Sequence, residues 1–198
     1  RLTVARDELF RLQNLFNDRT DQGMAAQLND FFQGLQDVST NPGDPATRSV
    51  LLTKASDLAA GLNQTAEDLR LARQSLNAQV TQAVTDVNSL AKQIAKLNDQ
   101  IVTAEVSGQQ ANDLRDQRDL TINELAQRVD VTTFEDPTGA VSVFVARGQI
   151  LVEKGRPFEL AAIPSATNQG MVGIGYVTSG GGVASLDPLI SNGRLRAL

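Results

Sequence analysis

A serine and a lysine three residues apart form the most suggestive catalytic pair in this sequence. Ser89-Leu90-Ala91-Lys92 matches the S-x-x-K pattern, in which some acylating hydrolases carry a nucleophilic serine. Those enzymes also use S-D-N and K-T-G motifs, and neither follows in this chain. Leu90 belongs to an apolar helix stripe described below. We therefore expect the motif to be structural.

Two other patterns resemble ligand sites. Gly170, Gly173 and Gly175 have the wrong spacing for a dinucleotide fingerprint, and no helix follows to offer its N-terminus. We expect them to allow close backbone approach in a strand.

Three aspartates recur every third residue near a helix start, at Asp113, Asp116 and Asp119. One helix offers a cation too few convergent oxygens, so we expect these acids to pair with neighbouring arginines.

Composition narrows the chemistry further. The chain has 198 residues, no cysteine, no histidine, 4% aromatic residues and a net charge of −5. Disulfides, Cys/His zinc sites and histidine acid–base catalysis are thereby excluded within it. No basic run interleaves with aromatics, and no apolar run approaches the roughly 18 residues of a membrane span. We predict no catalytic, cofactor-binding or metal-binding residues, no cofactor, no nucleic-acid or membrane partner, and no enzymatic activity.

One long helix should organise the chain. An apolar seam with heptad spacing runs from Leu62 to Ala104, interrupted by Arg73, and nothing between Pro45 and Ser107 forbids a single helix. Asp44 and Pro45 are suited to the N-cap and the first helical position, and Gly108 to the left-handed C′ position. Gly61 is the weak interior position and marks a candidate bend.

Shorter segments flank this helix. Apolar stripes predict helices over 1–17 and 24–39 before it and over 113–129 after it. On the last of these, Arg115/Asp119 and Glu124/Arg128 have i, i+4 spacing that predicts surface ion pairs.

Near Asp130 the apolar period changes from helical to alternating, which predicts strands. We expect them at 131–135, 140–145, 148–152, 158–161 and 172–177, with a flexible loop at Gly180–Gly182.

The predicted fold is α+β: an elongated antiparallel helical bundle around one long helix, with a small antiparallel β subdomain. We expect a helical rod domain at 1–130, a separate β-rich subdomain at 131–190 projecting from it, and the start of a helix returning to the bundle at 191–198. A Ser191 cap flanked by Ile190 and Leu195 marks that helix start. The chain reads as an excerpt cut at both ends through helical regions.

Four stretches together resemble the flagellar hook-associated protein 1 family, the hook-filament junction proteins of bacteria. The order of motifs carries the resemblance: Asp30-Phe31-Phe32-Gln33-Gly34-Leu35-Gln36, then Asn41-Pro42-Gly43-Asp44-Pro45-Ala46-Thr47-Arg48, Gln93-Ile94-Ala95-Lys96-Leu97-Asn98-Asp99-Gln100-Ile101, and Asn112-Asp113-Leu114-Arg115-Asp116-Gln117-Arg118-Asp119. It covers about 24–198. Arg115 departs from the family, which tends to show an apolar residue there.

The resemblance implies a non-enzymatic structural protein that is exported through the flagellar channel to the outside of the cell. There it would form an adaptor ring with copies of itself between hook and filament. Its implied partners are the hook protein, neighbouring hook-associated and filament proteins, and the export machinery.

Two other classes remain open. Val and Ile at a positions with Leu at d positions favour two-stranded coiled coils, so a homodimeric coiled-coil scaffold or signalling module is the alternative. The second is a hydrolase of the flagellar-cap muramidase type, using carboxylates of the β region. The acids available there before Asp187 are Glu135, Asp136, Glu153 and Glu159, and no motif pairs them.

Overall fold

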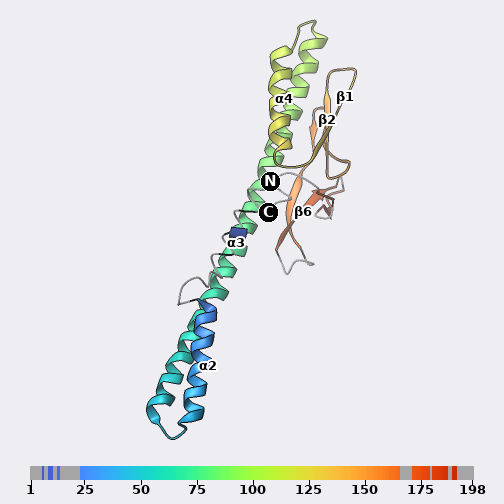
Figure 1. Ribbon diagram of the computed structural model, residues 1–198. Coiled ribbons are helices and arrows are strands. Elements are labelled where there is room, and N and C mark those ends of the chain that lie inside the picture. The colour runs from blue at the N-terminus through green and yellow to red at the C-terminus, as the bar shows by residue number, and fades with distance from the viewer. Residues whose placement is uncertain are drawn as a thin grey trace. The chain divides into compact units, whose positions relative to one another are not determined.

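The computed structural model describes residues 6, 9, 10, 13, 23–165, 171–178, 180–186 and 189–190 (Figure 1). The helices are α2 (Met24–Thr40), α3 (Pro45–Val106) and α4 (Asn112–Ala126). The strands are β1 (Val131–Glu135), β2 (Val141–Val145), β3 (Gln149–Glu153), β4 (Arg156–Pro157), β5 (Leu160–Pro164), β6 (Val172–Val177) and β7 (Val183–Ser185). The chain forms two compact units, an N-terminal unit within 6–75 and a C-terminal unit that includes 76–198, and α3 contributes to both.

Helix α3 begins and ends where its capping residues predict. At the start, Asp44 Oδ1 accepts a hydrogen bond of 3.0 Å from the Ala46 N–H, and Pro45 is the first helical residue. At the end, Gly108 is left-handed with φ +77°. Its N–H donates to the Glu105 carbonyl while the Gln109 N–H donates to the Ala104 carbonyl, which is the Schellman arrangement. The single 62-residue helix is therefore confirmed.

In the N-terminal unit, α2 packs against the first half of α3 through small residues. A Cβ placed on the buried Gly34 would lie 3.2 Å from Leu51 Cδ1 and 3.1 Å from Lys54 Cδ. On α3, a Cβ on Gly61 would lie 2.1 Å from Gln27 Oε1. Gly61, a candidate bend in the sequence, is thus the place where a side chain of α2 comes close to α3.

Two antiparallel sheets complete the C-terminal unit. One has the strand order β1-β2-β3-β4 and the other β5-β6-β7. Along β2, Val141, Val143 and Val145 are buried and alternate with half-buried residues, as a strand with one face on a core requires. The core they join includes Val87 and Ile94 of α3, both fully buried.

Contrary to our prediction, the strands therefore do not form a separate subdomain that projects from the helices. They lie on α3 and share its core, because a sheet with one apolar face needs a partner surface and the apolar seam of α3 supplies it. Only part of the seam is used in this way: Val87 and Ile94 are fully buried, whereas Leu62 is 53% exposed.

The remaining expectations divide into three groups. The α+β class and the change from helix to strand near Asp130 are confirmed, as are the helices expected at 24–39 and 113–129, although the second of these ends three residues early, at Ala126. Strand β5 begins two residues later than expected, and the short strands β4 and β7 were not predicted. The helices expected over 1–17 and from 191 lie outside the described residues, apart from isolated positions in the first.

Candidate functional site

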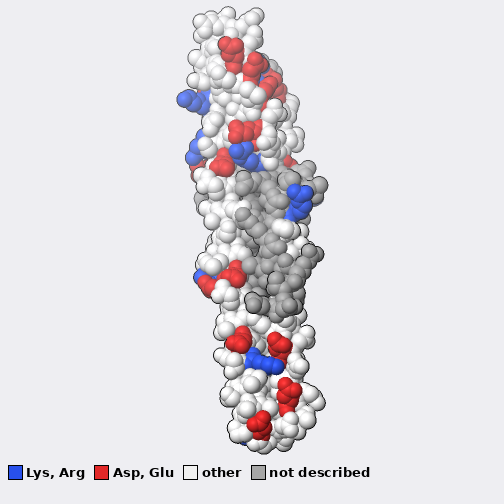
Figure 2. All heavy atoms as spheres, turned by 60° about the vertical axis from the view of Figure 1, so that its left-hand side comes forward, with Lys and Arg blue, Asp and Glu red and all other residues white. Residues whose placement is uncertain are grey.

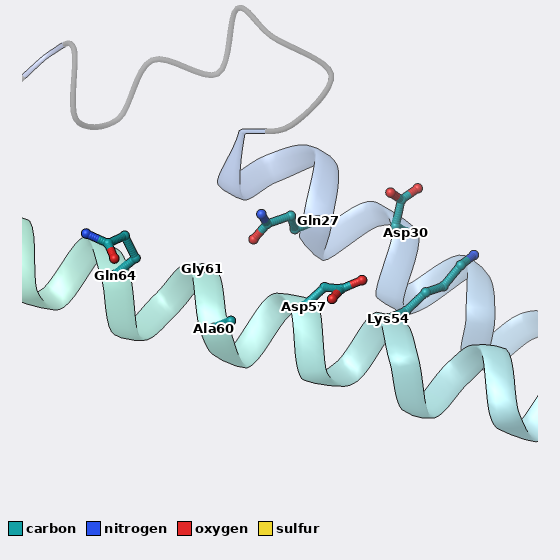
Figure 3. A pocket seen from close by; sticks show the side chains of 7 residues that line it. All are labelled: Gln27, Asp30, Lys54, Asp57, Ala60, Gly61 and Gln64. Carbon is teal, nitrogen blue, oxygen red and sulfur yellow. The ribbon is translucent and has the colours of Figure 1, made fainter.

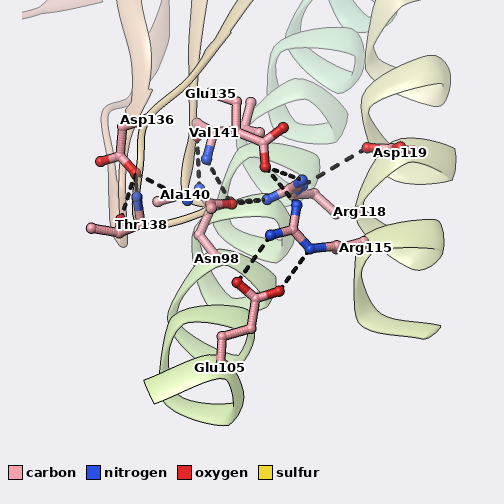
Figure 4. A network of polar contacts seen from close by, with 11 residues as sticks. Asn98, Glu105, Arg115, Arg118, Asp119, Glu135, Asp136, Thr138, Ala140 and Val141 are labelled. Atoms are coloured by element: carbon pink, nitrogen blue, oxygen red, sulfur yellow. Dashed lines mark hydrogen bonds and ion pairs between the residues drawn. The ribbon is translucent and has the colours of Figure 1, made fainter. Parts of the chain in front are cut away.

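A buried asparagine of α3 is the centre of the densest polar arrangement in the C-terminal unit (Figure 4). Asn98 is fully buried, and its amide donates to the carbonyl oxygens of Val141 and Lys154, both at 2.7 Å. Its Oδ1 accepts from the Val141 N–H at 3.0 Å and from Arg118 Nη1 at 3.3 Å. One side chain thus uses its full hydrogen-bonding capacity to join α3, the start of β2, the β3–β4 turn and α4.

Arg118 of α4 is the second buried polar residue and reaches the same place. Arg118 is 2% exposed, and its Nη1 also donates to the Gly139 carbonyl at 2.6 Å. The nearest carboxylates are those of Glu135, 3.7 Å from Nη2, and Asp119, 3.8 Å from Nε. Arg118 therefore contacts the hairpin turn through the Gly139 carbonyl, while its buried guanidinium, which is costly unless paired, is only loosely paired with carboxylates.

Arg115, one turn earlier on α4, forms an outer clamp over the same hairpin. Its Nε and Nη2 donate to the two carboxylate oxygens of Glu105 at 2.8 and 3.0 Å, and Nη1 donates to Glu135 Oε1 at 2.5 Å. The hydrogen bonds that Arg115 donates, and then its charge, lower the pKa of Glu105. The same bonds to Glu105 and Glu135, and then the charges of these carboxylates, raise the pKa of Arg115. A Cβ on Gly139 would lie 2.6 Å from Arg115 Nη2, so the clamp requires a glycine there. We call Asn98, Glu105, Arg115, Arg118 and Glu135 the polar junction.

The turn between β1 and β2 is held by hydrogen bonds of its own, in addition to those of the polar junction. Asp136 Oδ1 accepts from the backbone N–H groups of Thr138 at 2.8 Å and Ala140 at 3.3 Å, and from the Thr138 hydroxyl. Hydrogen bonding from Thr138 is the main cause of the lowered pKa of Asp136. Gly139 is left-handed, with φ +81°. The aspartate therefore closes the turn by itself and contributes no free carboxylate.

Two further asparagines of α3 hold strands in a similar way. The Asn88 amide donates to the Leu160 carbonyl at 2.8 Å and Asn88 Oδ1 accepts from the Leu160 N–H at 2.9 Å. Asn77 Oδ1 accepts from the Val172 N–H at 2.9 Å. Together with Asn98 they fall at intervals of about three helical turns, so their side chains share one face of α3. Each satisfies strand backbone groups where a sheet lies against a helix.

The S-x-x-K motif is divided between the core and the surface. Leu90 is buried, with 6% exposure, whereas Ser89 is exposed and accepts a hydrogen bond of 3.4 Å from Gln93. Lys92 pairs with Glu159 at 2.7 Å, and both side chains are more than half exposed. A nucleophile needs a base within hydrogen-bond reach, whereas here Ser89 bonds to Gln93 and Lys92 pairs with Glu159.

The other expected candidates are also dispersed or structural. Asp113, Asp116 and Asp119 are exposed, and no group of three potential metal ligands occurs among the described residues. A Cβ on Gly175 would lie 2.3 Å from Val183 Cγ1, which confirms close approach in that strand. Gly170 lies outside the described residues. The predicted ion pair Glu124/Arg128 forms at 3.0 Å, but Arg115 pairs with Glu105 and Glu135 in place of Asp119.

A separate cleft lies between α2 and α3 in the N-terminal unit (Figure 3). Its volume is about 540 Å³, and it is lined by Gln27, Asp30, Lys54, Asp57, Ala60, Gly61 and Gln64. The lining has no aromatic or large apolar side chain, whereas small-molecule sites are lined mainly by such residues. We therefore assign the cleft no ligand.

The described surface carries mixed charge. On the face in Figure 2, acidic and basic side chains are interspersed among uncharged ones, without an extended basic area in its described part. None of the described helices has a stretch long and apolar enough to cross a membrane.

Comparison with known proteins identifies the family. The family described as "Flagellar hook-associated protein FlgK helical domain" matches residues 9–198. The chain belongs to the FlgK family. It is 32% identical over 197 residues to flagellar hook-associated protein 1 of Escherichia coli K12, covering 98% of this chain and 36% of that protein. The same protein of Bacillus subtilis 168 is 34% identical over 145 residues, covering 73% of this chain and 29% of the relative.

A solved FlgK structure has the same fold. The flagellar hook junction protein FlgK of Burkholderia pseudomallei superposes with a TM-score of 0.89 at 31% identity, covering 99% of this chain and 36% of that one. The resemblance predicted from the sequence motifs is thus confirmed, for a chain that spans between 29% and 36% of the length of these relatives. Two of the motifs, around Asn98 and around Arg115 and Arg118, supply most of the polar junction.

Sequence reasoning found these motifs but missed what their residues do. Arg118 falls on the apolar stripe that Leu114, Ile122 and Leu125 form along its helix, and an arginine at such a position was the available signal of a buried polar contact. Asn98 gave no comparable signal, because asparagine is common on exposed helix faces. Its role depends on Val141 and Lys154, which are 43 and 56 residues away in sequence.

Proposed function

We propose that this chain is the helical-domain portion of a structural protein of the bacterial flagellum, an adaptor subunit that joins the hook to the filament. The observation that carries this proposal is the match of 99% of the chain to the hook junction protein of B. pseudomallei, with a TM-score of 0.89. In a mechanical part, buried polar groups should be used to hold elements together. The polar junction and the three asparagines of α3 are used in that way.

The whole protein, of which this chain spans a part, would act outside the cell after passage through the flagellar export channel. It would assemble as a ring of copies of itself, in contact with the hook protein on one side and further hook-associated or filament proteins on the other. The family name, flagellar hook-associated protein, supports association with the hook. The ring and the export route are the more specific parts of the proposal.

We further propose that the protein is not an enzyme. The acids of the β region support this, because they are engaged in holding the fold: Glu135 pairs with Arg115, Asp136 closes a turn, and Glu159 pairs with Lys92. A peptidoglycan turnover assay on the purified full-length protein should give no release above buffer. Turnover that is lost in Glu135→Gln would instead support the carboxylate hydrolase.

The test of the main proposal is genetic. Cells from which the full-length gene is deleted should build hooks but release filament subunits into the medium, and complementation should restore attached filaments. Electron microscopy of isolated hook–basal bodies reports the structures directly. Attached filaments of normal length in the deletion strain would refute the adaptor role.

A further inference from the structure

We propose that the tip of the β1–β2 hairpin, residues 135–141, is a latch that opens from α3 and α4 as a unit together with the β3–β4 turn, residues 153–156. Opening would break the hydrogen bonds of Asn98 and expose Arg118 to water, while the helices and the rest of the sheet stay folded. This inference is independent of the proposed flagellar function.

The polar contacts that hold the tip converge on few residues, beside the buried side chains of Ala140 and Val141, which are 2% and 5% exposed. Asn98 binds both the N–H and the carbonyl of Val141 and the carbonyl of Lys154, so one side chain ties down the tip and the neighbouring turn together. Arg118 binds the Gly139 carbonyl, and Arg115 binds Glu135. A small number of concerted bonds therefore separates the closed tip from an open one.

The tip is itself a preformed piece. Asp136 bonds to the backbone of Thr138 and Ala140, and the Asp136 N–H donates to the Ala140 carbonyl at 2.9 Å. None of these bonds involves α3 or α4. The tip can therefore leave the helices without losing its internal hydrogen bonds, which makes separation as a unit less costly than unravelling.

Arg118 provides the physical reason why this place opens before others. Among the described residues its Nε has no hydrogen-bond partner, and Nη2 lies 3.7 Å from Glu135 Oε1, beyond a direct hydrogen bond. A buried charge that is only partly paired carries a large desolvation cost, and opening would return that hydration. Water is near, because the side chains of Glu135 and Asp119 are 46% and 67% exposed.

The surroundings should stay in place when the tip opens. Leu125 of α4 and Ile101 of α3 are fully buried, and Val143 and Val145 of β2 are 0% and 1% exposed in the shared core. These apolar contacts contain no charge that gains hydration on opening. The boundary of the opening unit therefore falls at Val141, whose backbone N–H and carbonyl are held by Asn98 and whose side chain already belongs to the apolar core.

Hydrogen exchange followed by mass spectrometry on the full-length protein tests the latch. Backbone amides of 136–141 should exchange at least tenfold faster than those of the buried α3 segment 83–95. Asn98→Leu should accelerate the tip a further tenfold or more. The matched control, Asn88→Leu on the same helix, should leave the tip unchanged. Equal exchange of tip and helix in the parent, or equal acceleration of the tip by Asn98→Leu and Asn88→Leu, would overturn the proposal.

A covalent lock tests the same idea without removing a junction residue. A Cβ on Gly155 would lie 2.5 Å from Asp99 Cγ, the atom whose place a cysteine sulfur would take, and this chain has no other cysteine. In Asp99→Cys with Gly155→Cys, oxidation should slow exchange of 136–141 at least tenfold, and reduction should reverse it. An oxidised lock that leaves the tip as fast as in the reduced protein would contradict opening as one unit.

Discussion

At the scale of residues, most of the described polar groups that sequence patterns suggested as catalytic or ligand-binding lie on the surface. The polar residues that hold the elements of the C-terminal unit together are buried. Among the described residues, the buried polar residues are Asn98 and Arg118. Both lie within the motifs on which the resemblance to the family was predicted. Apart from the bond that joins them, their hydrogen bonds go to backbone groups of the strands and turns, so both residues hold elements of the fold together.

Asn98→Leu keeps the side chain close in size but removes four hydrogen bonds. Val141 and Lys154 would then hold buried groups without partners, at roughly 1–3 kcal/mol each. We expect the free energy of unfolding of the C-terminal unit to fall by about 2–5 kcal/mol in urea titrations followed by circular dichroism. The control Asn123→Leu, at an exposed position of α4, should change it by less than about 0.5 kcal/mol. Equal effects from the two substitutions would contradict the assigned role.

The Glu105–Arg115 pair predicts a pH dependence. The pKa of Glu105 in the folded protein is below its ordinary value of 4.5, mainly because Arg115 donates hydrogen bonds to it. The stability this pair contributes is therefore present above pH 4.5 and is lost as the pH falls through the lowered pKa. Parent and Glu105→Gln should differ most in denaturant midpoint near neutral pH and converge in acid. A difference that grew below pH 4.5 would contradict this sign.

At the scale of elements, local signals determined helix α3 and long-range packing determined what covers it. Asp44, Pro45 and Gly108 were sufficient to place both ends of α3, because caps act through adjacent backbone groups. The heptad seam could not reveal its partner, since a helix, a second chain or a sheet buries the same apolar positions. The short strands β4 and β7 also escaped prediction, because their residues carry no alternating pattern long enough to read.

Two leucines in equivalent heptad positions separate the sequence expectation from the structure. Leu90 is 6% exposed and Leu62 is 53% exposed. Leu90→Ala should therefore cost about 2–5 kcal/mol through lost burial and a residual cavity, whereas Leu62→Ala should cost about 0.5 kcal/mol or less. Chemical denaturation of the full-length variants measures both. Comparable losses would mean that the whole seam is covered, as a coiled-coil partner would do.

At the scale of the whole molecule, the chain consists of two compact units that share one helix, in a family of flagellar hook-associated proteins. The class of fold and the family could be predicted from periodicity and motif order. The way the sheets dock could not, because it depends on contacts between residues such as Asn88 and Leu160, 72 positions apart.

The most direct test of the structural account compares a junction residue with a candidate nucleophile in cells. A strain lacking the full-length gene is complemented with Asn98→Leu, Ser89→Ala or the parent, at equal secreted levels, and filament retention is scored by electron microscopy. We predict that Asn98→Leu loses filaments while Ser89→Ala retains them as the parent does. Loss of filaments in Ser89→Ala with normal retention in Asn98→Leu would contradict the account and place the function in a chemical site on α3.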